Sequence, residues 1–230
     1  MKYPFKFSIF LILIASYVPT ILGHTILGTD TKLSGTHQII SYIKSDDLRI
    51  RHTRAMYSKM CAGKTQDYLE LDGPMNPDAP YVIEKLLQKI KSSPKRCRDE
   101  NGDYPGIQVF LNSGGGFMKD GYALGEIFRE MGATTRITGT CYSSCATAFL
   151  GGSKRVMDDG GELMFHAPFR YSSEGEITCL RRGEYLKYYM KQMIGDENGD
   201  LLHKRTMRYC SQSSGWTLNK GAAEVFGLLN

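Results

Sequence analysis

One stretch near the middle of the chain decides the fold class: GTCYSSCATAFLGG, residues 139–152. It places two serines, Ser143 and Ser144, between two cysteines, and small residues surround all four. Three roles are open for these residues: a serine can cap a helix with its hydroxyl, the cysteines can form a metal or redox pair, and one serine can be a nucleophile. The small neighbours favour a nucleophile, because they leave space beside a serine at a tight turn.

A nucleophilic serine needs a base, and His166 is the candidate. It lies in the sequence Leu-Met-Phe-His-Ala-Pro, where it closes an apolar strand just before a proline. A strand-end histidine can also have a purely structural hydrogen bond. The other four histidines lie in polar segments without such a context.

A second candidate segment is the glycine-rich run Asn-Ser-Gly-Gly-Gly at residues 112–116. Glycines permit positive φ and a close approach of the backbone to a ligand. Free N–H groups at the start of the following helix would face a developing negative charge. The alternative is a tight strand-to-helix turn. A phosphate loop is disfavoured, because the run lacks the Gly-Lys-Ser/Thr ending.

Hydrophobic periodicity predicts alternating strands and helices through the middle of the chain, which is typical of an α/β layered fold. In the N-terminal part it predicts one strand at 38–43. The next predicted elements are strands at 68–71, 107–111, 134–137 and 161–166, a strand position at Val156, and helices at 82–90 and 117–131. The C-terminal third is predicted to be helical, at 180–194, 201–209 and 219–227.

Taken in order, the three motifs resemble the proteolytic subunit of the Clp protease (ClpP). They are still more similar to exported, ClpP-like bacterial proteins with a Cys-x-Ser-x-Cys core. The resemblance extends from about residue 68 to 227 and implies a ClpP/crotonase-like spiral of β-β-α units with C-terminal helices. The predicted domains are a signal peptide at 1–23, an N-terminal polar region at 24–66 and a ClpP-like domain at 67–230.

The resemblance also implies roles for four residues. Ser143 matches the nucleophile and His166 the base, while the backbone N–H groups of Gly115 and Ser144 match the two oxyanion donors. The implied activity is that of a serine-type hydrolase, a peptidase acting on peptide or protein substrates. The alternatives are a catalytically inactive binding or assembly protein and a crotonase-type acyl-CoA enzyme, although an exported location argues against a CoA substrate.

Two departures from the family pattern concern the loop and the base. Gly114 replaces the family's loop proline, which makes the turn less rigid. The family's third catalytic residue, an acid, falls in a segment that has none. Ser213, Ser214, a backbone carbonyl or an acid from elsewhere must then orient the histidine. Asp158 and Asp159 are acids to consider, although they fall in a predicted turn.

The N-terminus has the pattern of a secretory signal peptide. Lys2 and Lys6 precede an uncharged apolar run at 7–18, and a small residue, Gly23, ends the segment. The protein is therefore expected to be exported, to the periplasm or the medium. The alternative is a membrane anchor through residues 7–22.

Charge and cysteine content narrow the expected partners. Removal of residues 1–23 takes away two lysines and no acid, so the net charge falls from +5 to +3, which is too small to indicate nucleic-acid binding. Six cysteines allow up to three disulfides, and the absence of Cys-x-x-Cys argues against a metal site; no cofactor is expected. Cys141 and Cys145 are interpreted as buried framing residues with a disulfide partner elsewhere. The resemblance implies a homo-oligomer, for which the apolar face of the helix at 180–194 is a candidate; that face can equally pack on its own sheet.

Overall fold

The computed structural model describes residues 25–26, 31–32, 37–56, 65–94, 106–180 and 183–230. The predicted signal peptide or anchor lies outside these ranges, as do Cys61 and Cys97. Within these ranges, no helix has the length and apolar character that crossing a bilayer requires.

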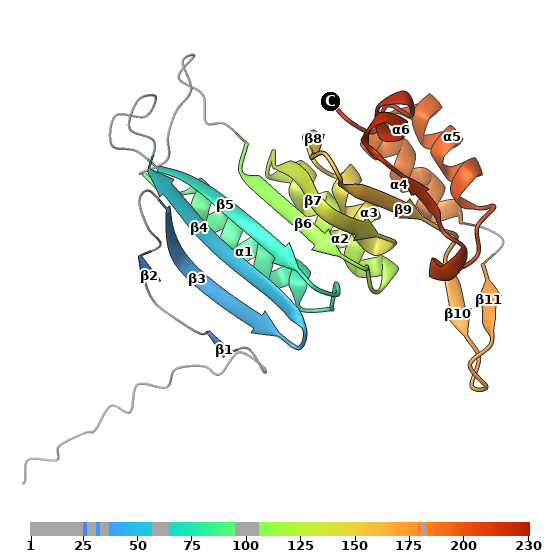
Figure 1. Cartoon of the computed structure of the whole chain (residues 1–230), viewed down its shortest axis with the longest axis horizontal. Helices are drawn as coiled ribbons and strands as arrows, with labels where there is room; N and C mark the ends of the chain where they lie inside the picture. Colours follow the sequence, from blue (N-terminus) through green and yellow to red (C-terminus); the bar gives the residue numbers. More distant parts are fainter. Residues whose placement is uncertain (1–24, 27–30, 33–36, 57–64, 95–105, 181–182) are drawn as a thin grey trace, which may run out of the picture.

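A ten-stranded sheet runs through the molecule (Figure 1), and its main order is β1-β3-β4-β5-β6-β7-β9-β12, with β2 on β3 and β8 on β7. The N-terminal strands and the last pair are antiparallel, whereas β5, β6, β7, β8 and β9 pair in parallel. The strands are β1 (Thr25–Ile26), β2 (Thr31–Lys32), β3 (His37–Ser45), β4 (Leu48–Met56), β5 (Thr65–Asp72), β6 (Gln108–Ser113), β7 (Thr134–Tyr142), β8 (Lys154–Met157), β9 (Glu162–Phe165) and β12 (Trp216–Leu218).

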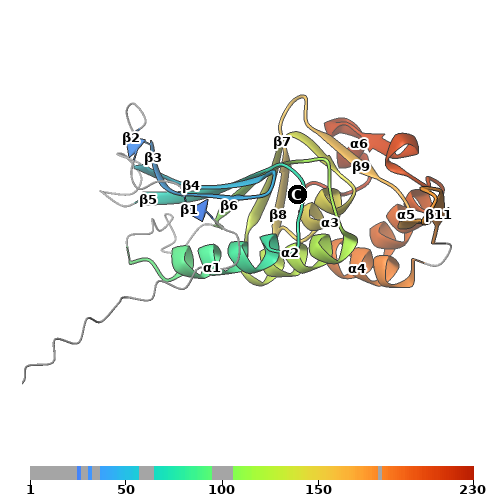
Figure 2. The same cartoon turned by 90° about the horizontal axis from the view of Figure 1, so that it is seen from below.

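Helices connect the parallel strands and cover one side of the sheet. Figure 2 shows α1, α2 and α4 in a row below it. The helices are α1 (Ala79–Lys91), α2 (Met118–Glu130), α3 (Ser144–Leu150), α4 (Glu184–Ile194), α5 (Asp196–Thr206), α6 (Lys220–Val225) and the short 3-10 helix η1 (Gln212–Ser214). Burial follows the apolar periodicity: α1 buries Val82, Ile83, Leu86, Leu87 and Ile90, the face that the sequence predicts.

The parallel strands bring the three sequence motifs together. Parallel strands end at the same edge of a sheet, which is where sites form in α/β folds. Ser113 at the end of β6 pairs with Cys141, and Tyr142 at the end of β7 pairs with Met164 of β9. The glycine run, the serine turn and the histidine strand end therefore meet at one edge.

Three parts of the structure differ from the sequence prediction. Residues 37–56 form two long strands, not one, and the second of them, β4, pairs with β5. At the start of β4, Arg49 and Arg51 alternate with the buried Leu48 and Ile50, and both arginines form ion pairs with acids of β5. The strand was missed because this alternation breaks at His52 and Thr53, which are buried although they are polar.

The other two differences lie in the C-terminal third, which is not wholly helical. Residues 169–179 form a hairpin of β10 (Phe169–Tyr171) and β11 (Ile177–Cys179), and α4 begins only at Glu184. β12 pairs with β9 as an added edge strand. Each of these strands has only three residues, too few for a period-two pattern to be recognised.

Candidate active site

Ser143 lies at the turn between β7 and α3, in a backbone conformation that side-chain-bearing residues rarely adopt: φ 58° and ψ −119°. Its N–H donates to the Met164 carbonyl (2.8 Å), and its own carbonyl accepts from the Thr147 N–H (3.1 Å). The turn is therefore tied to β9 on one side and to the helix on the other. A strained serine at a strand-to-helix turn is the geometry that exposes a nucleophile in several hydrolases.

A disulfide between Cys141 and Cys145 brackets this turn. The expectation that they pair elsewhere is wrong: Cys141 lies near the end of β7, Cys145 lies in the first turn of α3, and the turn between them brings their Cα atoms to 5.1 Å. Both cysteines are fully buried, at 0 % exposure. The disulfide joins the two elements that hold Ser143.

Gly115 packs directly against the serine turn. Its φ is +99°, and an added Cβ would lie 2.6 Å from the Tyr142 carbonyl oxygen and 2.8 Å from the Ser143 Cβ. Only glycine satisfies both the conformation and the contact. The position that a Cβ would take is 3.3 Å from the Ser144 backbone nitrogen, so the two predicted oxyanion donors lie close together.

The two predicted donors differ in their present partners. The Gly115 N–H donates to Ser113 Oγ (3.0 Å), so a substrate oxygen must displace this hydroxyl to accept the bond. Ser144 is the first residue of α3, where a helix leaves its N–H groups without an intrahelical acceptor. The Ser113 contact was not predicted, because a side chain bonding to the backbone two residues on leaves no distinct sequence signal.

His166 follows β9 and is buried, with 5 % of its surface exposed. Its Nδ1 lies 2.9 Å from the Ala167 carbonyl oxygen. A carbonyl can only accept, so Nδ1 carries the proton and donates it, while Nε2 keeps a lone pair. Burial lowers the pKa of His166 below its ordinary value of 6.5, and the hydrogen bond to Ala167 opposes this only in part. In this tautomer Nε2 is the ring atom that can accept a proton, and the lowered pKa favours the uncharged ring.

In the described part of the chain, neither Ser213 nor Ser214 has a hydrogen bond to the His166 ring. The hydroxyls of Ser213 and Ser214 lie 2.9 and 3.2 Å from Ser211 Oγ, so the three serines bond to one another. Among the described residues, the hydrogen bond of the His166 ring goes to a backbone carbonyl, one of the options that the sequence left open. The role of Ser213 or Ser214 as orienter stays a prediction.

The acids that the sequence left open are occupied elsewhere. Arg136 Nε donates to Asp158 (2.8 Å), and Lys220 Nζ donates to Asp159 (2.9 Å). Both carboxylates are therefore paired with basic side chains and not with His166.

Ser143, His166 and Gly115 line one cleft of about 930 Å³. No direct hydrogen bond joins Ser143 to His166 among those of the described chain; such bonds commonly tighten only when substrate binds. Most of the cleft surface is apolar. Its apolar lining residues are Pro74, Met75, Phe117, Met118, Pro168, Phe169, Tyr171 and Leu180.

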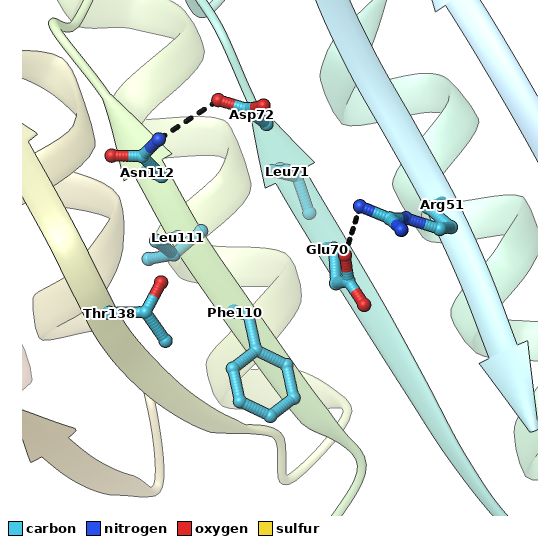
Figure 3. A pocket seen from close by; sticks show the side chains of 8 residues that line it. All are labelled: Arg51, Glu70, Leu71, Asp72, Phe110, Leu111, Asn112 and Thr138. Carbon is cyan, nitrogen blue, oxygen red and sulfur yellow. Dashed lines mark hydrogen bonds and ion pairs between the residues drawn. The ribbon is translucent and has the colours of Figure 1, made fainter. Parts of the chain in front are cut away.

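A second, smaller cavity of about 320 Å³ lies on strands β4 to β7, where Arg51 pairs with Glu70 and Asn112 with Asp72 (Figure 3). Its charged groups have ion-pair partners, Arg51 with Glu70 and Asp72 with Arg49, so it is the weaker candidate for a site. Asn112 borders both cavities: its Nδ2 donates to Asp72 (3.0 Å), and its Oδ1 accepts from the Thr140 N–H (3.1 Å). It holds the strand ends on either side of the glycine run, a structural role that sequence analysis missed.

The fold and the cleft define a class: an α/β protein with a serine at a strand-to-helix turn, a histidine at a strand end and a glycine loop between them. Comparison with solved structures places the fold among ClpP-like proteins. ClpP1 from Listeria monocytogenes is 19% identical at a TM-score of 0.52, covering 71% of this chain and 88% of that one. A point mutant of the same protein gives 20% identity, a TM-score of 0.53 and the same coverage.

A point mutant of the 1510-N membrane-bound stomatin-specific protease is 14% identical at a TM-score of 0.53, covering 70% of this chain and 75% of that one. No protein-family model and no curated protein matches the sequence. At these identities the likeness shows the fold alone. The chain has the ClpP-like α/β fold that the sequence resemblance implied.

Proposed function

We propose that the protein is an exported serine hydrolase, a peptidase, with Ser143 as nucleophile and His166 as base. The observation that carries the proposal is the shared cleft: a strained serine, a neutral histidine and the Gly115 loop line one cavity. In the reaction, Ser143 Oγ attacks a carbonyl carbon while His166 Nε2 takes its proton. The base then returns the proton to the leaving amine, and water releases the acyl group by the same steps.

The N–H groups of Gly115 and Ser144 are proposed to hold the oxyanion, and one such donor is typically worth about 3 kcal/mol. For this, the Gly115 N–H must exchange its bond to Ser113 Oγ for one to the substrate oxygen. The hydrogen bond to the Ala167 carbonyl keeps the proton on Nδ1 of His166, so that Nε2 can accept the proton of Ser143. A carbonyl lacks the full charge of a carboxylate, so we expect slower turnover than in a Ser-His-Asp enzyme.

The apolar cleft supports a peptide or protein substrate, and the ClpP-like fold supports assembly into a homo-oligomer. Two disulfides, Cys141–Cys145 and Cys179–Cys210, support an exported location, because disulfides persist in oxidising compartments. Export to the periplasm or the medium and anchoring through residues 7–22 are both compatible with them.

A fluorophosphonate probe tests the nucleophile directly, because it reacts with an activated serine and needs no known substrate. We expect labelling of the wild type, with the modified peptide mapped to Ser143. Ser143→Ala should abolish it, whereas Ser144→Ala should retain it, because the backbone N–H of residue 144 survives the substitution.

A folded but unlabelled wild type would contradict the hydrolase proposal. It would favour the second candidate, a non-catalytic binding protein on the same scaffold. One observation favours that candidate: His166 has no carboxylate partner among the described residues.

A further inference from the structure

The β10–β11 hairpin forms one wall of the cleft but is not part of the main sheet. Among the described strands, its two strands pair with no others, and Phe169 lies opposite Cys179 and Tyr171 opposite Ile177. Figure 1 shows the hairpin projecting beyond the ten-stranded sheet. Phe169, Arg170 and Tyr171 all line the cleft, and so does Leu180 at the hairpin's end.

The hairpin that forms this wall is mostly exposed to solvent. Residues 170–178 are all exposed, and Tyr171 exposes 67% of its surface. A two-stranded hairpin without further packing is marginally stable in water. Its shape must therefore depend on contacts at its base.

Two contacts of the described residues tie that base to the site. The Phe169 ring packs beside the His166 ring, with centroids 5.3 Å apart. On the other strand, Cys179 forms a disulfide with Cys210, 31 residues further along the chain. The neighbour of Cys210, Tyr209, accepts a hydrogen bond from the Ala167 N–H. The disulfide thus joins the hairpin to the segment that lies against the strand end carrying the histidine.

The two disulfides differ in access to solvent. Cys141 and Cys145 are fully buried, whereas Cys179 and Cys210 are only partly buried. A small reductant in solution therefore reaches the Cys179–Cys210 bond first, because thiol–disulfide exchange requires direct attack on a sulfur.

We propose that the Cys179–Cys210 disulfide holds the β10–β11 hairpin as the polypeptide-binding wall of the cleft, and that its reduction weakens substrate binding while Ser143 stays reactive. The inference rests on the proposed peptidase function and adds a redox control of its substrate binding. A dithiol supplies the chemistry. One thiolate attacks a disulfide sulfur, the S–S bond breaks, and the second thiol releases the first. Two electrons and two protons pass to the cysteines, which become thiols, and the reductant becomes a cyclic disulfide.

The test compares the wild type with Cys179→Ala/Cys210→Ala in two assays that report on different parts of the site. The fluorophosphonate probe is small and reports on Ser143 and its base rather than on the hairpin, so its labelling rate should agree within about twofold between the two proteins. Hydrolysis of fluorescein-labelled casein needs the wall, so we expect KM to rise at least tenfold while kcat stays within about threefold. An equal loss of labelling and hydrolysis would instead indicate general damage to the site and would overturn the inference.

A binding assay separates this inference from the proposed function. In the Ser143→Ala background, casein binding followed by fluorescence anisotropy should weaken at least tenfold when both cysteines are replaced. Hydrogen exchange at residues 169–180 should become faster, with α2 and α3 unchanged as internal controls. These two measurements decide the inference even if the wild type is never labelled. Equal casein binding, no casein binding by either protein, or unchanged exchange in the hairpin would each overturn it.

Dithiothreitol treatment of the wild type covers the case in which the double variant does not fold. Alkylation and peptide mapping should find Cys179 and Cys210 opened while Cys141 and Cys145 stay paired, together with the same rise in KM. Opening of both disulfides at the same rate, or no change in KM after Cys179–Cys210 opens, would contradict the proposal.

Discussion

Ser143 has a conformation whose cost the surrounding residues must offset. A side-chain-bearing residue at φ 58° is less stable than in the usual regions by about 1–3 kcal/mol. The hydrogen bonds to Met164 and Thr147 and the Cys141–Cys145 disulfide hold it there. Ser143 is the N-cap residue of α3, but its side chain makes no capping hydrogen bond.

A single residue, His166, also sets the pH dependence of fluorophosphonate labelling. Burial holds the pKa of His166 below 6.5, and only the neutral ring accepts the proton of Ser143. The rate constant for fluorophosphonate labelling should therefore still exceed half of its plateau value at pH 6.5 and fall only at lower pH. His203→Gln is the matched control, because His203 lies on α5, away from the lining of the cleft, and its removal should leave the midpoint unchanged. A labelling midpoint above pH 6.5 for the wild type would exclude His166 as the base.

Among the elements, α2 and α3 approach each other through glycines. A Cβ on Gly121 would lie 2.5 Å from the Ser144 carbonyl, and one on Gly151 would lie 2.0 Å from the Gly125 carbonyl. Backbone therefore packs on backbone along this interface. The close contact fixes where α3 begins, and with it the position of the serine turn relative to the glycine loop.

Gly151→Ala should destabilise the protein by about 1–3 kcal/mol, because its methyl group can be accommodated only if α2 and α3 move apart. Urea unfolding at equilibrium measures the change. The control is Gly221→Ala in α6, where the nearest atom is 3.9 Å away and alanine is the better helix former. This variant should be as stable as the wild type or slightly more stable. An unchanged urea midpoint for Gly151→Ala would show that the two helices are not in backbone contact.

On the scale of the whole molecule, the N-terminal strands extend the sheet beyond β5, and a buried polar cluster joins β4 to β5. His52 Nε2 lies 2.7 Å from the Asp67 carboxylate, and Arg54 Nε donates to the same oxygen (2.9 Å). Burial alone would raise the pKa of Asp67. The hydrogen bond from His52 and the charge of Arg54 outweigh burial, and the pKa of Asp67 is lower than its ordinary 3.8. The ionised carboxylate therefore joins β4 to β5.

Asp67→Asn should lower the free energy of unfolding by about 3 kcal/mol at pH 7, since it removes one partner from a buried charged cluster. Glu70→Gln, in the exposed pair with Arg51, should cost less than about 1 kcal/mol. The sign of the pH effect follows from the lowered pKa: the stabilisation is full above pH 3.8 and is lost as pH falls through the folded-state value. Urea unfolding at pH 7 and below pH 3.8 should show the gap between wild type and Asp67→Asn closing in acid. A gap of the same size at both pH values would contradict the ionic role.

The central part of the fold could be predicted because its determinants are local. The strand before residues 112–116 is a short, mainly apolar run that ends in small residues, the strand before residues 139–152 is rich in β-branched residues, and α1 has a clear apolar face. The hairpin β10–β11 could not be predicted in this way, since its exposed strands have no apolar period and are held by a disulfide to a distant residue. The pairing of Cys141 with Cys145 was missed for another reason: it depends on the geometry of the turn, not on spacing alone.

The sequence by itself indicated an α/β layered fold through its alternating strands and helices, and the resemblance of its three motifs to ClpP implied the ClpP-like fold and the candidate residues. Only the tertiary structure decided their relations. Parallel strand ends at one edge bring Ser143, His166 and Gly115 into a single cleft. The His166 ring donates its hydrogen bond to the Ala167 carbonyl, and the Gly115 N–H donates to Ser113 Oγ. These contacts depend on the three-dimensional positions of backbone and hydroxyl groups, which no sequence pattern identifies.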